Sequence, residues 1–255
     1  MSGDRLAVRD RLLNFLVLSC EHGGNRVPAA YADLFAGRAA ARALASHRGS
    51  DLGALALAES MARRLRAPLV ASTVTRLLVD LNRSVGHRSL FSEFSRVLDR
   101  EARQRLLERH YLPHRERVTE IVRSSIARNG RVVHVAVHSF TPRLGSKRRC
   151  ADFGLLYDPA RPLERSLSAR WKDLLQSVDS HPRVRRNYPY RGAADGLTTH
   201  LRMCFSGGAY LGLELEVNEE LLRNAAVETA DAVVASLTGL GVSGGGRSGA
   251  TMRKR

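Results

Sequence analysis

The sequence contains little cysteine, and its cysteines are not arranged for cross-linking or for a structural metal site. Cys20, Cys150 and Cys204 are odd in number, and none belongs to a Cys-x-x-Cys pair. Disulfide-stabilised small domains and zinc ribbons both need closely spaced, paired cysteines. The sequence therefore argues against these two classes, and we expect a cytoplasmic protein in a reducing compartment.

Long hydrophobic runs are also missing. A membrane-spanning helix needs about 20 consecutive apolar residues, and no segment of the 255 residues reaches that length. The short apolar stretch at 12–20 is followed directly by Glu21 and His22, with no small-residue cleavage site. We interpret it as a core strand rather than as a signal peptide, and we expect no membrane partner.

Aromatic residues make up only 5% of the chain, whereas its net charge is +16. Such a charge can attract nucleic acid non-specifically or steer anionic ligands. Proteins that bind single strands also stack bases on aromatic rings, and the basic residues here are nearly all arginines spread along the chain. Nucleic-acid binding is therefore the weaker interpretation, and a small anionic substrate is compatible with the charge.

The apolar residues, 44% of the chain, are sufficient for a core and recur in two kinds of pattern. Apolar or alternating runs predict strands at 13–19, 69–73, 76–81, 131–137, 152–157 and 210–217. Helical spacing predicts helices at 51–65, across 94–129 with an interruption at Pro113, at 166–178 and at 219–237. This alternation predicts one α/β domain over 1–240, with a largely parallel sheet between two layers of helices. The Gly/Ser-rich basic segment 241–255 is expected to be a disordered tail.

Several predicted strands end in, or carry, side chains suited to catalysis. These residues are Glu21, His22, Asn82, Arg83, His138, Ser139, Glu214 and Glu216. Ligands of open parallel sheets bind at the carboxyl ends of the strands. A zinc hydrolase needs three nitrogen or oxygen ligands, a carboxylate that accepts a proton from water, and a cation for an anionic substrate. The set offers all three, which favours a metal hydrolase.

Each of these residues also has a structural interpretation. A histidine after a strand commonly makes a structural hydrogen bond, and an Asn-Arg pair such as Asn82-Arg83 is typical of a turn. Glu216 in an alternating strand could face water, and Asp51 stands where the helix at 51–65 would have its N-cap. Only their joint position at several strand ends favours a common site.

Eight segments, in the same order along the chain, resemble the N-formylglutamate amidohydrolase family. They are SCEHGGNRVPAAY (19–31), HRGSDLGALALA (47–58), TRLLVDLNRS (75–84), VHSFTP (137–142), FGLLYDP (153–159), RRNYPY (185–190), DGLTTH (195–200) and LELEVNEELL (213–222). The Asp-Leu-Asn-Arg segment also resembles the wider zinc carboxypeptidase and aspartoacylase group. The resemblance implies a phosphorylase/hydrolase-like α/β fold with a mixed sheet, helices on both faces and a metal at its rim.

The resemblance also implies a set of metal ligands. His22 and His138 match the histidines of the family's metal site. Asn25 stands where the carboxypeptidase pattern has a glutamate, so Asn25 is not expected to bind metal. Asp51 matches an aspartate of the family and becomes the candidate third ligand. The implied cofactor is Zn²⁺ or another divalent metal.

Further roles follow from the same resemblance. Asn82 and Arg83 match the pair assigned to the substrate carboxylate, for which the planar fork of arginine is suited, and we count Arg83 among the catalytic residues. Glu216 matches a late-strand glutamate and is the expected general base. Glu214 lies two residues earlier on the same face of the strand, so the two can be exchanged in this assignment.

Arg191 and His200 are expected to complete the substrate pocket. The implied reaction is hydrolysis of the amide bond of an N-acyl, and in the simplest case N-formyl, acidic amino acid such as N-formylglutamate. One alternative keeps the metal but acts on another carboxylated amide or peptide, and a second is a non-catalytic anion-binding or nucleic-acid-binding protein. A serine nucleophile is disfavoured because no Gly-x-Ser-x-Gly motif is present, and a thiol at Cys20 is a minor alternative. The sequence does not predict an oligomeric state.

Overall fold

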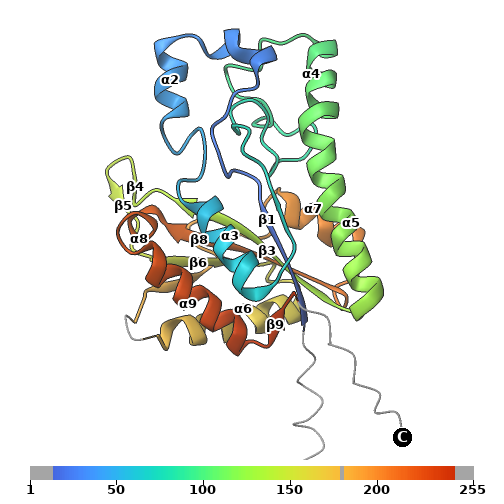
Figure 1. The fold of residues 1–255 in the computed structure, drawn as a ribbon, viewed down its shortest axis with the longest axis vertical. Coiled ribbons are helices and arrows are strands. Elements are labelled where there is room, and N and C mark those ends of the chain that lie inside the picture. Colours follow the sequence, from blue (N-terminus) through green and yellow to red (C-terminus); the bar gives the residue numbers. More distant parts are fainter. Residues whose placement is uncertain (1–13, 179–180, 245–255) are drawn as a thin grey trace, which may run out of the picture.

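A seven-stranded sheet forms the centre of the computed structural model, which describes residues 14–178 and 181–244 (Figure 1). Its strands are β1 (Asn14–Cys20), β2 (Leu69–Ala71), β3 (Val132–Phe140), β6 (Phe153–Leu156), β7 (Val184–Arg186), β8 (Tyr210–Asn218) and β9 (Val242–Ser243). The strand order is β2-β1-β3-β8-β6-β7, and β9 pairs with β1. All pairs are parallel except β6 with β8. The expected mixed, mostly parallel sheet is therefore confirmed.

Helices cover both faces of this sheet. Helices α3 (Ala54–Leu65), α6 (Pro162–Gln176) and α9 (Ala226–Gly239) pack on one face, and α5 (Leu112–Asn129) and α7 (Leu197–Cys204) pack on the other. Alternate residues of a strand point to opposite faces. Accordingly, Leu16 and Leu18 of β1 belong to the first core, while Val17 belongs to the second. The predicted three-layer fold is confirmed.

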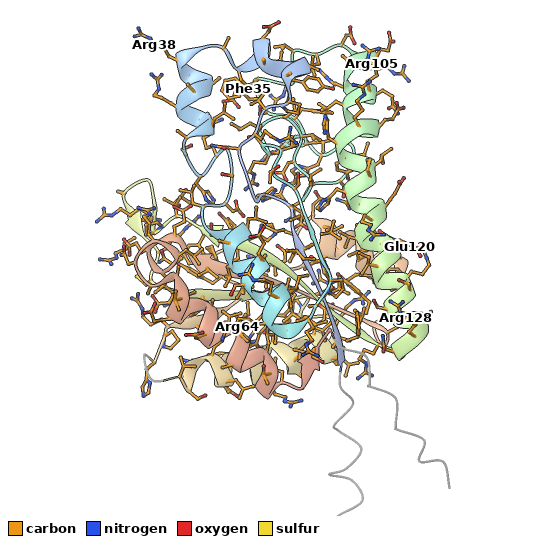
Figure 2. The ribbon with its side chains drawn as sticks, in the orientation of Figure 1. Phe35, Arg38, Arg64, Arg105, Glu120 and Arg128 are labelled. Atoms are coloured by element: carbon orange, nitrogen blue, oxygen red, sulfur yellow. The ribbon has the colours of Figure 1, made fainter. Side chains whose placement is uncertain are left out.

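A third hydrophobic cluster lies away from the sheet, at the top of Figure 1. It is built from η1 (Ala29–Phe35, a 3-10 helix), α2 (Arg38–Leu44), α4 (Arg100–Leu106) and the loops between 74 and 98. Phe35, Leu78 and Leu106 are buried in it. The exposed arginines lie on the outside of the molecule, as Arg38, Arg64, Arg105 and Arg128 do in Figure 2.

One predicted strand is wrong. Residues 76–81 form consecutive turns, in which the Thr75 hydroxyl accepts a hydrogen bond from the Leu77 amide at 3.3 Å and Asp80 accepts one from the Asn82 amide at 3.0 Å. Such local side-chain bonds compete with strand pairing. The apolar residues of this segment are buried in the third cluster instead of in the sheet.

Several helix boundaries differ from the prediction. The long helical region begins at Arg100, not at residue 94, and Pro113 lies in the first turn of α5 without interrupting it. Between α4 and α5 the chain makes a π-helical turn, η2 (Leu107–Tyr111). The closing helix is divided at Ala225 into α8 (Glu219–Asn224) and α9. A small hairpin, β4 (Arg143–Leu144) with β5 (Lys147–Arg148), precedes β6.

The first residues of the expected tail are not disordered. Val242 and Ser243 pair with β1 as β9, so the start of the segment 241–255 belongs to the sheet. The rest of the expected tail, 245–255, lies outside the described residues, as does 1–13. None of the helices in the described part of the chain is both long and apolar enough to span a bilayer.

Candidate active site

The carboxyl ends of β1, β3 and β8 bring the predicted site residues together. His22 follows β1, and Glu214 and Glu216 lie on β8. His138 was expected just after its strand, but β3 continues to Phe140, and His138 pairs with Glu216 across the two central strands. Because strand pairing fixes these positions, the sheet itself holds an imidazole beside a carboxylate.

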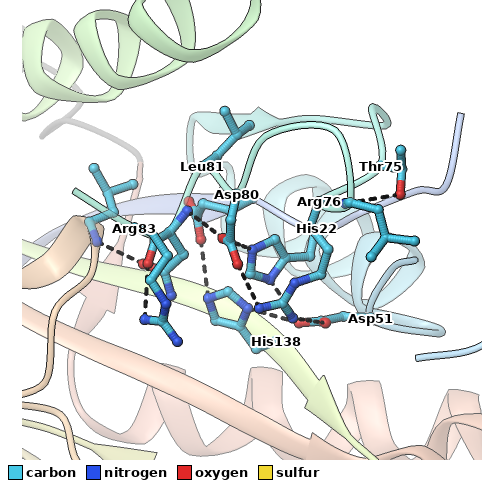
Figure 3. A network of polar contacts seen from close by, with 12 residues as sticks. His22, Asp51, Thr75, Arg76, Asp80, Leu81, Arg83 and His138 are labelled. Atoms are coloured by element: carbon cyan, nitrogen blue, oxygen red, sulfur yellow. Dashed lines mark hydrogen bonds and ion pairs between the residues drawn. The ribbon is translucent and has the colours of Figure 1, made fainter. Parts of the chain in front are cut away.

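His22, Asp51 and His138 converge at this edge (Figure 3). Nδ1 of His22 lies 3.4 Å from Oδ2 of Asp51, and Nδ1 of His138 lies 2.9 Å from the same oxygen. All three side chains are buried, and each offers one ligand atom within 4.8 Å of the others. Asp51 is not the N-cap of α3, since that position is held by Gly53, with its left-handed φ of 78°.

The remaining nitrogens of the two histidines face other carboxylates. Nε2 of His22 lies 2.7 Å from Asp80 Oδ1, and Nε2 of His138 lies 3.1 Å from Glu21 Oε2. Glu21 is fully buried, with His114 3.5 Å from its other oxygen. Pairs of histidine and carboxylate of this kind orient imidazoles that bind metals. Each histidine is thus held with Nδ1 directed toward Asp51.

The charges of this cluster shift its pKa values strongly. Burial alone raises the pKa of a carboxylic acid, but the histidines and Arg76 outweigh it and lower the pKa of Asp51 well below its usual range. Arg76 lies 2.8 Å from Asp80 and 3.3 Å from Asp51, and with His22 it lowers the pKa of Asp80 despite burial. Burial lowers the pKa of His138, but Asp51 and Glu21 outweigh it and raise that pKa well above its usual value. The side chains of the cluster therefore form a network of ion pairs.

The donor set fits a divalent metal. Nδ1 of His22 is buried without a hydrogen-bond partner among the described residues, and an unpaired buried polar atom is costly unless a ligand satisfies it. Two imidazole nitrogens and one carboxylate oxygen are a ligand set that catalytic zinc sites use, with a further position left open. His22, Asp51 and His138 are therefore the residues that could hold the metal.

The two carboxylates of β8 face the site from the same side but differ in their partners. Glu214 accepts a hydrogen bond from the Thr198 hydroxyl at 2.6 Å. Glu216 has one buried oxygen, Oε2, without a partner in the described chain. Burial, opposed only in part by His138, raises the pKa of Glu216 to about 8. Glu214 is therefore held by a hydrogen bond within the protein, whereas one oxygen of Glu216 has no such partner in the described chain.

A cavity of about 340 Å³ opens onto these residues and contains two further cations. Arg83 and Arg191 both line it. Arg83 donates a hydrogen bond to the backbone oxygen of Asp195 at 2.6 Å, and Arg191 is exposed, with no side-chain hydrogen bond in the described chain. Asn82 also lines the cavity, but its side-chain oxygen accepts a hydrogen bond from the Leu197 amide at 2.7 Å and so serves the start of α7.

The structure does not bring His200 to this cavity. Thr198 of α7 points toward the site, where its hydroxyl donates a hydrogen bond to Glu214. A residue two positions later on a helix lies about 200° further round the helix axis. His200 accordingly lines a different cavity, between α5 and α7, together with Tyr111 and Arg115. Its expected role in the substrate pocket stays a prediction, which the position of His200 in another cavity does not support.

Sequence reasoning also missed part of the site. Asp80 and Arg76, which brace the metal-site residues, lie in the segment predicted as a strand. Thr198 and Asp195 belong to the DGLTTH segment (195–200), and the sequence predicts no separate role for either. Asp80 could have been predicted as a site residue, because it belongs to the same Asp-Leu-Asn-Arg motif as Asn82 and Arg83.

Neither nucleophile alternative gains support from the geometry. The Ser139 hydroxyl donates to the backbone oxygen of Leu52 at 2.9 Å. Burial, reinforced by Glu21 and Asp51, raises the pKa of the Cys20 thiol well above its usual value. A reactive cysteine needs the opposite shift.

Comparisons with known proteins agree with this fold. A family model described as N-formylglutamate amidohydrolase matches residues 15–222. The crystal structure of a gene product of Agrobacterium tumefaciens is 28% identical, with a TM-score of 0.73 over 91% of this chain and 94% of that one. The crystal structure of N-formylglutamate amidohydrolase from Ralstonia eutropha is 23% identical, with a TM-score of 0.66 over 90% of this chain and 92% of that one. No curated protein matches the chain significantly in sequence.

Proposed function

This chain belongs to the N-formylglutamate amidohydrolase family, and from that premise we propose that it removes the formyl or another acyl group from an N-acylated acidic amino acid such as N-formylglutamate. Family membership makes it a hydrolase of carbon–nitrogen amide bonds. The substrate, the metal and the roles of the residues are the proposal. Its main support is the convergence of His22, Asp51 and His138 beside Glu216.

We assign the metal to His22, Asp51 and His138. A divalent metal such as zinc supplies Lewis-acid chemistry there: it polarises an amide carbonyl and lowers the pKa of water toward about 7. Asp80 and Glu21 hold the two imidazoles with Nδ1 toward Asp51, so the protein fixes the ligand atoms in advance. Arg76 offsets the negative charge of Asp51 and Asp80.

Glu216 is the proposed general base. Glu216 lines the cavity, its buried Oε2 has no hydrogen-bond partner in the described chain, and its pKa of about 8 allows proton exchange near neutral pH. It accepts a proton from the attacking water and returns it to the amine that leaves. Glu214, held by Thr198, helps to keep the pKa of Glu216 raised through like-charge repulsion.

Arg83 and Arg191 are the proposed partners of the substrate carboxylates. An acidic N-acyl amino acid carries two carboxylates, and these two arginines line the same cavity as Glu216. A guanidinium can meet a carboxylate with two parallel hydrogen bonds. The contact from Arg83 to the Asp195 backbone fixes one end of its fork, which reduces the entropy lost on binding.

The test is a hydrolysis assay on N-formylglutamate and N-formylaspartate, with N-acetylglutamate and a cell-wall peptide as comparison substrates. We expect release of formate, loss of activity after treatment with a chelator, and recovery when zinc is added. If only N-acetylglutamate or the cell-wall peptide is hydrolysed, the result would favour the alternative that the enzyme acts on another carboxylated amide. Activity that survives complete metal removal would contradict the proposed mechanism.

Two further expectations concern the location of the protein and its wider relatives. We propose a cytoplasmic location, which is consistent with three free cysteines, two of them exposed. The relation to the wider zinc carboxypeptidase and aspartoacylase group stays a prediction from the Asp-Leu-Asn-Arg segment.

A further inference from the structure

Two side chains, one from η2 and one from α5, hold the backbone at Arg83. The Tyr111 hydroxyl donates a hydrogen bond to the backbone oxygen of Arg83 at 2.8 Å. Nη1 of Arg115 donates to the same oxygen at 3.3 Å and to the backbone oxygen of Leu81 at 3.1 Å. Three hydrogen bonds from two side chains thus fix the turn just before and at Arg83.

The π-helical turn η2 explains how these side chains reach the loop. Leu106 and Tyr111 are five residues apart, a spacing that a regular α-helix would rotate by about 140° around its axis. Both are nevertheless buried in the same cluster, since the wider turn at Leu107–Tyr111 lies between them. Single π turns are frequent at functional sites. Here the turn allows Leu106 and Tyr111 to pack in the third cluster together, while the Tyr111 hydroxyl reaches the backbone of Arg83.

Arg115 is an unusual residue to bury for structural reasons alone. Only 5% of it is exposed, and no carboxylate of the described chain forms an ion pair with it. Its guanidinium lies 5.2 Å from the centre of the Tyr111 ring. Burying a guanidinium is costly unless its hydrogen bonds are satisfied, and the side-chain bonds it makes go to the backbone oxygens of Leu81 and Arg83.

A second set of contacts holds the other side of the same loop. Arg83 donates to the backbone oxygen of Asp195, and both the amide and the hydroxyl of Ser84 donate to the Asp195 carboxylate. Arg83, which lines the cavity, therefore belongs to a loop fixed at both sides, and Figure 3 shows its side chain beside His138.

From these contacts we infer that Tyr111 and Arg115 are positioning residues for substrate binding: they hold the Arg83 backbone so that its guanidinium meets the substrate carboxylate. The inference rests on the proposed function, because it takes Arg83 as the carboxylate partner. Neither residue lines the cavity that contains Glu216. They act through Arg83, so their loss weakens binding of the carboxylate and leaves proton transfer unchanged.

The test is a double-mutant cycle between Tyr111→Phe and Arg83→Met. Its readout is the Kd of N-formylglutamate for the chelator-treated protein, measured by calorimetry, so that no turnover is needed. Loss of one hydrogen bond predicts that Tyr111→Phe weakens binding roughly three- to tenfold. In the Arg83→Met background the same change should have no further effect, because coupled residues are not additive. An equal loss in both backgrounds indicates a merely structural role and overturns the inference.

Two further variants separate positioning from folding. Arg115→Lys keeps a cation that can reach one carbonyl, so it should recover part of the binding that Arg115→Met loses. The controls are Arg117→Lys, an exposed position on the same helix, and Tyr31→Phe, whose hydroxyl makes no hydrogen bond in the described chain. Both controls should bind like the wild type. In the metal-loaded enzyme, KM should rise for Tyr111→Phe while kcat changes less than about twofold, since an interaction lost equally from ground and transition states leaves kcat unchanged.

A crystal structure of Tyr111→Phe tests the inference without any substrate. We expect the Arg83 guanidinium to leave the backbone oxygen of Asp195. An Arg83 that keeps its position overturns the inference, whichever substrate the enzyme uses. If the wild type binds N-formylglutamate without hydrolysing it, the proposed reaction is wrong, and the binding cycle still decides the role of Tyr111.

Discussion

The imidazole rings of His22 and His138 lie with their centres 5.1 Å apart and their planes tilted by 56°. Both rings direct Nδ1 to the same oxygen of Asp51 and Nε2 to a carboxylate of their own. One ring follows the end of β1 and the other belongs to β3, two adjacent parallel strands. The sheet thus fixes His138 on β3 and places His22 directly after β1, while the loop before α3 brings Asp51 to both rings.

The two carboxylates of β8 should differ sharply in their effect on catalysis. Glu216→Gln keeps the size of the side chain but cannot accept a proton, so kcat should fall roughly 10²- to 10⁴-fold while the metal and the fold are retained. Glu214→Gln should cost much less, since Glu214 is hydrogen-bonded to Thr198. Steady-state kinetics with confirmed metal content provide the measurement. Full activity in Glu216→Gln would refute the assignment and move the role to Glu214.

Arg83→Lys should damage substrate binding more than stability. Lysine keeps the charge but not the planar fork, and loss of a charge-assisted hydrogen bond costs about 1.5–3 kcal/mol. This corresponds to a drop in kcat/KM of roughly tenfold to 150-fold. Steady-state kinetics on N-formylglutamate measure kcat/KM, and thermal unfolding of the same sample measures Tm. A large fall in Tm with normal kinetics would instead make Arg83 a structural residue.

Asp80→Asn should weaken metal binding without removing a ligand. Asp80 holds Nε2 of His22 at 2.7 Å, and loss of such an outer partner typically costs 10- to 100-fold in metal affinity. Competition with a chelator of known affinity measures the change. Asp231→Asn, an exposed aspartate on α9, is the control and should bind zinc like the wild type. Equal affinities in both variants would mean that the carboxylate does not support the metal site.

Zinc binding should release protons at pH 7. Asp51 and Glu21 raise the pKa of His138 well above its usual value although burial opposes them, and burial raises the pKa of Glu216 to about 8. Nδ1 of His138 can bind a cation only after its proton leaves. The apparent affinity for zinc should therefore fall as the pH is lowered. Burial lowers the pKa of His134 to about 4, so that histidine stays neutral and adds nothing.

Calorimetry in buffers with different heats of ionisation counts the released protons. We expect between one and two per zinc ion. Binding that releases no proton and keeps its affinity from pH 8 to pH 6 would show that His138 is not a ligand.

The parts of the fold that the sequence predicted well are the strands with continuous apolar runs. β1, β3 and β8 are buried on both faces, and such strands leave a strong local signal. The segment at 76–81 has a similar pattern but is buried in a different cluster. Its turns depend on Thr75 and Asp80 and on packing against distant helices, which no local pattern records.

The convergence of the candidate ligands was predictable from the sequence, and the residues around them were less so. His22 and His138 follow from their position on strands, and the structure adds that Asp51 lies between them. The carboxylates that orient the histidines come from Glu21 and Asp80, and the second pairs with His22 across 58 positions of the chain. Contacts of this range depend on how loops cross above the sheet, so they appear only in three dimensions.

Anomalous diffraction at the zinc edge, from crystals of the wild-type chain loaded with zinc, tests the account most directly. The account predicts one strong peak between Nδ1 of His22, Nδ1 of His138 and the Asp51 carboxylate, at bonding distances of about 2.0–2.2 Å. The cavity that contains Glu216 and Arg83 should open onto that peak. No peak at this position, or zinc bound only elsewhere on the chain, would contradict the claim that this cluster is a metal-dependent amide hydrolysis site.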